Sequence, residues 1–117
     1  MTTIPPFDLS QLVDMYSGNM ANVYMTATVF CDQLEQDLSI VKDKFDEGDY
    51  PAVKAFAHRM KPNLKLFGVF DLHELVIEIE KSALDANVPL LGPQLDTLIN
   101  RGKDVIAALR VDIKNNN

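Results

Sequence analysis

The sequence predicts an all-α protein, an antiparallel up-down-up-down four-helix bundle with a short N-terminal helix packed on it. Apolar residues recur every three or four positions over long stretches, helix-capping residues return between these stretches, and strand signals are nearly absent. Because the connections have only a few residues, neighbouring long helices should run antiparallel. We expect one domain over residues 1–117, with helices at about 8–17, 20–47, 50–67, 71–86 and 88–113.

The first two helices are predicted from their caps and from one long apolar seam. Asp8 with Gln11 three residues later is typical of the start of a short helix that ends near Gly18, and Asn19 can cap the next one. The seam of the second helix comprises Met20, Tyr24, Ala27, Cys31, Leu34, Leu38, Val41 and Phe45. Further apolar residues lie off this seam, at Val23, Met25, Val29 and Phe30. We expect the short helix to cover some of them and to leave the rest open for a partner.

The other three helices are bounded in a similar way. The third begins at Asp49, has a proline in its first turn, where proline is tolerated, and ends at Gly68. Asp71 followed by Glu74 has capping-box spacing and predicts the start of the fourth helix. The fifth begins at the Asn-Val-Pro stretch 87–89.

Composition narrows the class of protein. With 117 residues, 47% apolar and 24% charged, the chain is typical of a globular domain. It has no apolar run of the ~18 residues that a membrane span needs, and residues 1–10 do not resemble a signal peptide, so we expect a cytoplasmic protein without membrane contact. A net charge of −6 argues against nucleic acid as a partner. Met1 and the polar end favour a free-standing protein, and we expect a monomer.

The third predicted helix differs in charge from the rest of the chain. Residues 51–68 contain four Lys and Arg residues and no Asp or Glu. On a helical wheel its apolar residues form one stripe, and the opposite side bears Lys54, His58, Lys61, Pro62 and Lys65. His58 should therefore face solvent, beside lysines that repel one another. A phosphoryl group accepted by the neutral imidazole would remove this repulsion, and Lys61 and Lys65 could hold it by charge-assisted hydrogen bonds.

The stretch AHRMKPNLKLFG resembles the motif of the histidine-containing phosphotransfer (HPt) domain of multistep phosphorelays. That motif has histidine, lysine at +3, a small residue at +4 and glycine at +10, here His58, Lys61, Pro62 and Gly68. The stretches FDLSQLVDMYSG and FDLHELVIEIEKSA are also similar to helices of that family, so the resemblance covers nearly the whole chain. Two positions depart from the usual pattern, since Lys65 stands where a small residue is common and Pro62 where glycine is. Proline, like glycine, keeps the +4 position low, so that a partner can approach the imidazole.

The resemblance implies that His58 accepts a phosphoryl group from an aspartate of one receiver domain and passes it to an aspartate of another. The partners would be receiver domains of response regulators and hybrid histidine kinases. The chain would be a carrier and not an enzyme, with no ATP site and no cofactor of its own. The Mg²⁺ for transfer would come from the receiver, in agreement with the lack of an acidic cluster near His58 in the sequence.

Other interpretations have less support from the sequence. Neither histidine follows a glutamate by three residues, so we expect no ferritin-like metal site. We expect His73 at the boundary of the core and Cys31 inside it as a small hydrophobic residue. A second function stays open, a non-catalytic HPt-like interaction module that binds a signalling partner without being phosphorylated. Leu66, at the Pro62 edge of the basic face, and Lys54 would then be docking residues.

Overall fold

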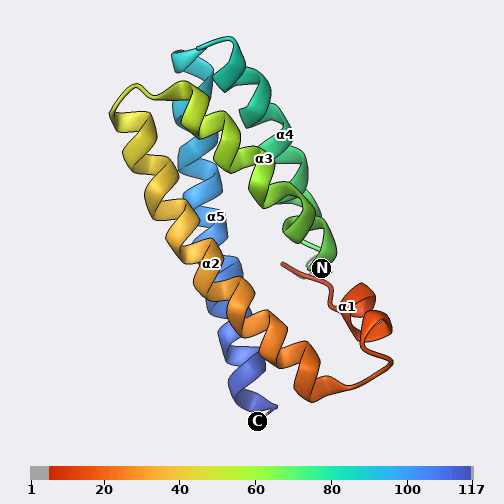
Figure 1. Cartoon of the computed structure of the whole chain (residues 1–117). Helices are drawn as coiled ribbons and strands as arrows, with labels where there is room; N and C mark the ends of the chain where they lie inside the picture. The colour runs from red at the N-terminus through yellow and green to blue at the C-terminus, as the bar shows by residue number, and fades with distance from the viewer. Residues whose placement is uncertain (1–5, 117) are drawn as a thin grey trace, which may run out of the picture.

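The computed structural model describes residues 6–116, in which five helices are joined by short turns (Figure 1). The helices are α1 (Ser10–Met15), α2 (Met20–Asp46), α3 (Tyr50–Leu66), α4 (Phe70–Leu84) and α5 (Val88–Asn115). Their limits differ from the expected ranges by no more than two residues, and residues 6–116 contain no strand. Residues 1–5, part of the stretch searched for a signal peptide, and residue 117 lie outside the described residues.

Side-chain caps fix the starts of three long helices. Asn19, Asp49 and Asn87 each accept a hydrogen bond from the backbone N–H three residues later, at 3.2, 3.2 and 3.3 Å. Such a bond satisfies one of the amide groups that have no partner within the helix. α2, α3 and α5 therefore begin where their capping residues predict.

Asp8 and Asp71 are not helix caps, contrary to the prediction from their spacing. α4 begins one residue before Asp71, and the Asp71 carboxylate pairs with Arg101 of α5. Asp8 lies two residues before α1 and accepts a hydrogen bond from the backbone N–H of Ser10 at 2.9 Å. Neither α1 nor α4 has a side-chain cap. Local spacing misplaced these two starts because other contacts hold the carboxylates.

The apolar seams of the four long helices meet in one hydrophobic core. α3 packs on α2 and most extensively on α4, and α5 also packs on α2 and α4, so the four helices surround a common interior (Figure 1). Cys31 of the α2 seam is only 1% exposed, as predicted. The rings of Phe30 and Phe67 stack with their centroids 4.0 Å apart and join α2 to the end of α3. α3 is therefore supported by a neighbouring helix on each side.

The first part of α2 is only partly covered by other segments. Val23 and Phe30, which the wheel places off the seam, are buried, whereas Met20 is 40% exposed. The prediction that the buried seam begins at Met20 is thus wrong, because the seam shifts toward the side that α1 covers. Met25 and Val29 stay 65% and 64% exposed.

The short helix α1 lies near the turn between α3 and α4 (Figure 1). Its Leu12 is fully buried, and the hydroxyl groups of Tyr16 and Thr26 are 2.8 Å apart, which ties α1 to α2. No helix within residues 6–116 is long and apolar enough to cross a membrane.

Candidate functional site

His58 lies in the middle of α3 and faces solvent. Its side chain is 71% exposed. On the opposite side of α3 the buried residues are Val53, Ala57, Met60 and Leu64. The imidazole is therefore accessible, as the helical wheel predicts, while the opposite side of α3 is packed in the core.

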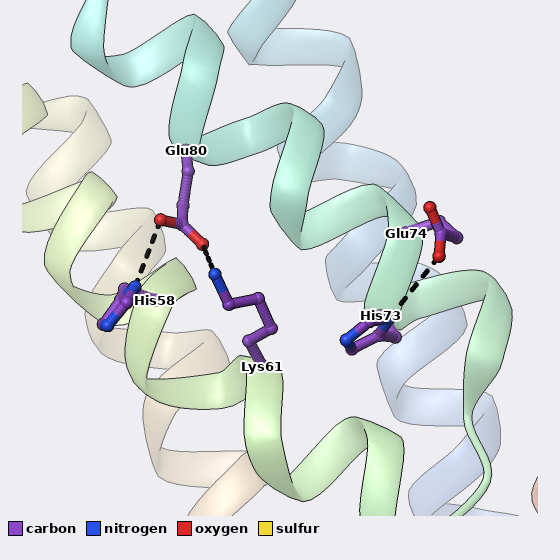
Figure 2. Close-up of polar contacts among 5 residues, drawn as sticks. All are labelled: His58, Lys61, His73, Glu74 and Glu80. Carbon is purple, nitrogen blue, oxygen red and sulfur yellow. Dashed lines mark hydrogen bonds and ion pairs between the residues drawn. The ribbon is translucent and has the colours of Figure 1, made fainter.

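A carboxylate from the neighbouring helix contacts both the imidazole and the lysine next to it. Glu80 of α4 has its Oε2 atom 3.2 Å from Nδ1 of His58, and its Oε1 atom accepts a hydrogen bond from Nζ of Lys61 at 2.9 Å (Figure 2). The Glu80 side chain is only 17% exposed. The helix of the histidine has no Asp or Glu of its own, as the sequence shows, and the acidic group comes from α4.

Glu80 determines which ring nitrogen of His58 is free to react. An ionised carboxylate only accepts hydrogen bonds, so the Nδ1 atom beside it carries the proton. In the neutral imidazole the lone pair then lies on Nε2. Figure 2 shows the Nδ1 edge of the ring toward Glu80 and the other nitrogen directed away from it. The exposed nitrogen is thus the nucleophilic one.

The two partners of Glu80 keep its carboxyl group ionised. Burial alone would raise the pKa of Glu80. Hydrogen bonds from Lys61 and His58, together with the charges of these groups, outweigh burial and hold the pKa below its ordinary value. The carboxylate can therefore accept both hydrogen bonds at neutral pH.

The other lysines of α3 differ from Lys61. Lys54 and Lys65 are exposed, and neither takes part in any of the salt bridges found within residues 6–116. Lys61 is held by Glu80 and is 31% exposed. The basic face therefore has one lysine that is already oriented and two that keep their full hydrogen-bonding capacity.

Leu66 does not have the exposed position that the wheel predicts. It is only partly exposed and packs against the hydrophobic core. The wheel considers α3 alone, whereas α1 also contacts this end of α3, where Gln11 donates a hydrogen bond to the carbonyl oxygen of Lys65 at 3.4 Å. The expected solvent-facing leucine beside Pro62 is therefore wrong.

Pro62 and Gly68 shape the backbone on either side of this end of α3. α3 continues through Pro62, which is exposed and has no N–H to offer to the carbonyl of His58. Gly68 has a φ of +67°, and a Cβ atom there would lie 2.5 Å from backbone and side-chain atoms of Asp8. The N–H of Asp8 also donates to the carbonyl of Phe67 at 3.0 Å. The motif glycine therefore lets the N-terminal segment pack directly on the end of α3.

His73, the second histidine, does not belong to this contact network. Its side chain is 18% exposed at the edge of the core, as predicted, and its Nδ1 atom is 3.5 Å from Oε1 of Glu74 (Figure 2). Across residues 6–116, no group of three or more His, Cys, Asp and Glu side chains could hold a metal ion.

Reasoning from the sequence missed Glu80, although a signal for it exists. The apolar seam of α4 is readable, and Glu80 directly follows its buried residue Ile79. His58 and Glu80 also lie at similar distances along the chain from Gly68, in the turn that joins two packed helices. Pairing residues across that turn would have placed an acidic side chain beside His58.

Comparison with known proteins agrees with this geometry. A family model described as Hpt domain matches residues 26–110, which include His58, Lys61 and Glu80. The fold is similar to that of histidine-containing phosphotransfer protein B (HptB) from Pseudomonas aeruginosa PAO1, with a TM-score of 0.85 and 17% sequence identity over 97% of this chain and 98% of that one. No curated protein matches the sequence.

Proposed function

We propose that His58 is the phosphoacceptor of this chain, which belongs to the Hpt domain family and is a phosphorelay intermediate. The observation that carries the proposal is the contact between Glu80 and Nδ1 of an exposed imidazole. This contact leaves the Nε2 lone pair directed at solvent, where a phosphoryl donor can reach it. A rigid helix and a fixed tautomer together preorganise the nucleophile.

In the proposed reaction, Nε2 of His58 attacks the phosphorus of an aspartyl phosphate on a receiver domain. A P–N bond forms, the P–O bond to the aspartate breaks, and the aspartate leaves as a carboxylate. The ring keeps its Nδ1 proton, and Glu80 stabilises the positive charge that develops on the imidazole. Attack by the aspartate of a second receiver reverses these steps and restores the neutral imidazole.

The lysines of α3 are proposed to stabilise the phosphoryl group. Lys61 lies one turn from His58 and can exchange the Glu80 oxygen for a phosphoryl oxygen. Lys65 lies one turn further along and supplies a second ammonium group, while Lys54 contacts the receiver. Pro62 has no long side chain and leaves the approach to the imidazole open.

The proposed function also involves the chain as a whole. We take residues 1–117 as one phosphotransfer domain that acts as a cytoplasmic monomer, and as a carrier without an ATP site. The Mg²⁺ for transfer is supplied by the receiver domain. Successive long helices run antiparallel in an up-down-up-down bundle, which the short turns between them support.

The test is transfer of label from a receiver domain. The wild-type protein, His58→Gln and the control His73→Gln are mixed with ³²P-labelled receiver domains and Mg²⁺. Acid-labile label should reach the wild type and the control but not His58→Gln, which should still bind the receiver. Label that persists on His58→Gln would refute the assignment of the site. Receiver binding without labelling of the wild type would instead favour a non-catalytic interaction module.

A further inference from the structure

The interior of the bundle contains a carboxylate that the proposed reaction does not use. Asp37 of α2 is only 4% exposed, and Ser82 is the other buried polar residue found within residues 6–116. Burying a carboxylate is costly unless it is paired. Asp37 forms an ion pair with Arg59 of α3 and accepts a hydrogen bond from Nε2 of Gln33 at 3.0 Å. The pair links the helix of the phosphoacceptor to α2.

Arg59 is held from two sides and yet remains open to solvent. Its guanidinium group contacts Asp37 and also lies over the ring of Phe56, with Cζ 4.7 Å from the ring centroid. The Arg59 side chain is nevertheless 57% exposed. A guanidinium group has five N–H donors, and one nitrogen of Arg59 serves Asp37. The remaining donors therefore have a fixed orientation and are available to a second acceptor.

Arg59 stands at the edge of a hollow between α2 and α3. This hollow has a volume of about 270 Å³, and its lining includes apolar residues, Phe30, Leu34 and Met60, and polar ones, Gln33, Asp37 and Asn63. It can receive one side chain of a partner, with aliphatic carbons against the apolar lining and a polar end at Arg59.

Arg59 lies beside His58 along α3 but faces a different neighbouring helix. Arg59 directly follows His58, so the two side chains leave α3 about 100° apart around the helix axis. His58 points to Glu80 on α4, whereas Arg59 points to Asp37 on α2. A partner broad enough to cover the exposed side of α3 can therefore contact both side chains.

We propose, on the basis of the function proposed above, that Arg59 determines which receiver domains bind, by pairing with an acidic side chain outside the phosphorylated aspartate. Asp37 is then a positioning residue that holds Arg59. An acidic partner fits because Arg59 keeps N–H donors that Asp37 does not use, and because Lys54 and Lys65 of the same helix have no acidic partner among the ion pairs found within residues 6–116. Pairing of a guanidinium with a carboxylate also restricts the partner's orientation.

Another arginine of the bundle shows how Arg59 differs from a purely structural ion pair. Arg110 of α5 uses both terminal nitrogens on acidic groups of α2, at 3.1 Å from Asp32 and 2.6 Å from Glu35. Arg59 has one acidic partner, and that partner is buried. Arg110 therefore provides a matched control, since its removal deletes the same charge and also breaks an ion pair between helices.

The test measures receiver binding and phosphotransfer separately. Purified receiver domains encoded in the same genome are titrated against the wild type, Arg59→Gln, Asp37→Asn and Arg110→Gln at two salt concentrations. The rate constant of transfer is also measured in single turnovers over a range of receiver concentrations, and phosphoramidate serves as a phosphodonor that needs no receiver. Unfolding curves show that each variant is folded.

Arg59→Gln should weaken receiver binding roughly tenfold, raise the receiver concentration that gives half of the maximal transfer rate, and flatten the salt dependence. The maximal rate constant of transfer and the labelling by phosphoramidate should be unchanged. Asp37→Asn should have a smaller effect of the same kind, and Arg110→Gln none. Equal binding by Arg59→Gln and the wild type at both salt concentrations would overturn this inference while leaving His58 as the phosphoacceptor. Binding that depends on Arg59 but never labels His58 would support the inference and refute the proposed function. If no receiver bound the wild type, both would be overturned.

Discussion

Two interfaces between neighbouring helices contain ion pairs with opposite ratios of acidic to nitrogen-bearing side chains. Between α2 and α5, Arg110 is bound by two acidic groups, Asp32 and Glu35. Between α3 and α4 the ratio is reversed, since Glu80 alone serves two nitrogen-bearing side chains. Exposed ion pairs of either kind add little to stability. From this comparison we expect that the charge balance of such an interface, and not its number of ion pairs, determines whether an anion binds there.

The charges at the interface between α3 and α4 suit the binding of a phosphoryl group. Its single carboxylate orients the imidazole of His58 and restrains Lys61, and Lys65 close by has no acidic partner among the described ion pairs. A phosphoryl group bound at this interface would neutralise the excess of positive charge. At the interface between α2 and α5, an excess of carboxylates would repel the same group.

The largest expected effect comes from disturbing the turn that sets how α3 and α4 meet. Gly68→Ala should lower the free energy of unfolding by about 3 kcal/mol, because a left-handed residue acquires a Cβ that overlaps Asp8. Gly48→Ala is the matched control, with a φ of +75° and no atom within 4 Å of the added Cβ. It should cost only about 1 kcal/mol. Equal losses in urea unfolding would show that contact with Asp8 is unimportant.

Removing Lys61, which Glu80 orients, should slow phosphotransfer more than removing a lysine of α5. Lys61→Gln should slow receiver-dependent transfer roughly 10- to 100-fold, since a hydrogen bond to a charged group contributes about 1.5 to 3 kcal/mol. Lys103→Gln, an exposed lysine of α5, should leave the rate unchanged. Rapid mixing with a phosphorylated receiver measures both rates. Equal rates for the two variants would show that the α3–α4 and α2–α5 interfaces do not differ in function.

The two prolines inside long helices separate stability from access to the site. Pro62→Ala and Pro93→Ala should each raise the free energy of unfolding by about 1 kcal/mol, because each restores a backbone hydrogen bond. Only Pro62→Ala should also slow transfer or weaken receiver binding, since Pro62 adjoins His58. If calorimetry shows the gain in stability but transfer and binding stay unchanged, the proline is merely tolerated.

The smallest expected effect is the dependence of stability on pH. Because the folded-state pKa of Glu80 is lowered, its stabilising contribution is complete above the ordinary value of 4.5 and is lost as the pH falls through the lowered value. At pH 7, Glu80→Gln should therefore be less stable than the wild type by less than about 1 kcal/mol. The difference should shrink toward pH 3 in urea titrations. A difference that persisted at low pH would mean that the charge of Glu80 is not its source.

Most of the helical framework could be predicted because it depends on local rules. Asn19, Asp49 and Asn87 cap helices through residues that are close in sequence, and the wheel correctly exposed His58. Local rules failed at Asp71, whose carboxylate is held by a distant residue. Each success needed only the residues of one helix or turn.

The contacts between helices could not be predicted from periodicity alone. Glu80 reaches His58 only because α3 and α4 pack in one particular register, and the wheel contains no information about register. Leu66 and Met20 were misplaced for a related reason, because the wheel of one helix contains no information about which of its flanks other segments cover. The wheel therefore placed His58, the proposed phosphoacceptor, at the surface but could not show the acidic group beside it.

The most direct test of the central claim is ¹⁵N NMR of the phosphorylated protein labelled at histidine. The two ring nitrogens have distinct shifts, so the spectrum shows which one bears phosphorus and which one bears the proton. If Glu80 selects the tautomer, phosphorus is bound to Nε2 of His58 and the proton stays on Nδ1. A phosphoryl group on Nδ1, or on any residue other than His58, would contradict the account.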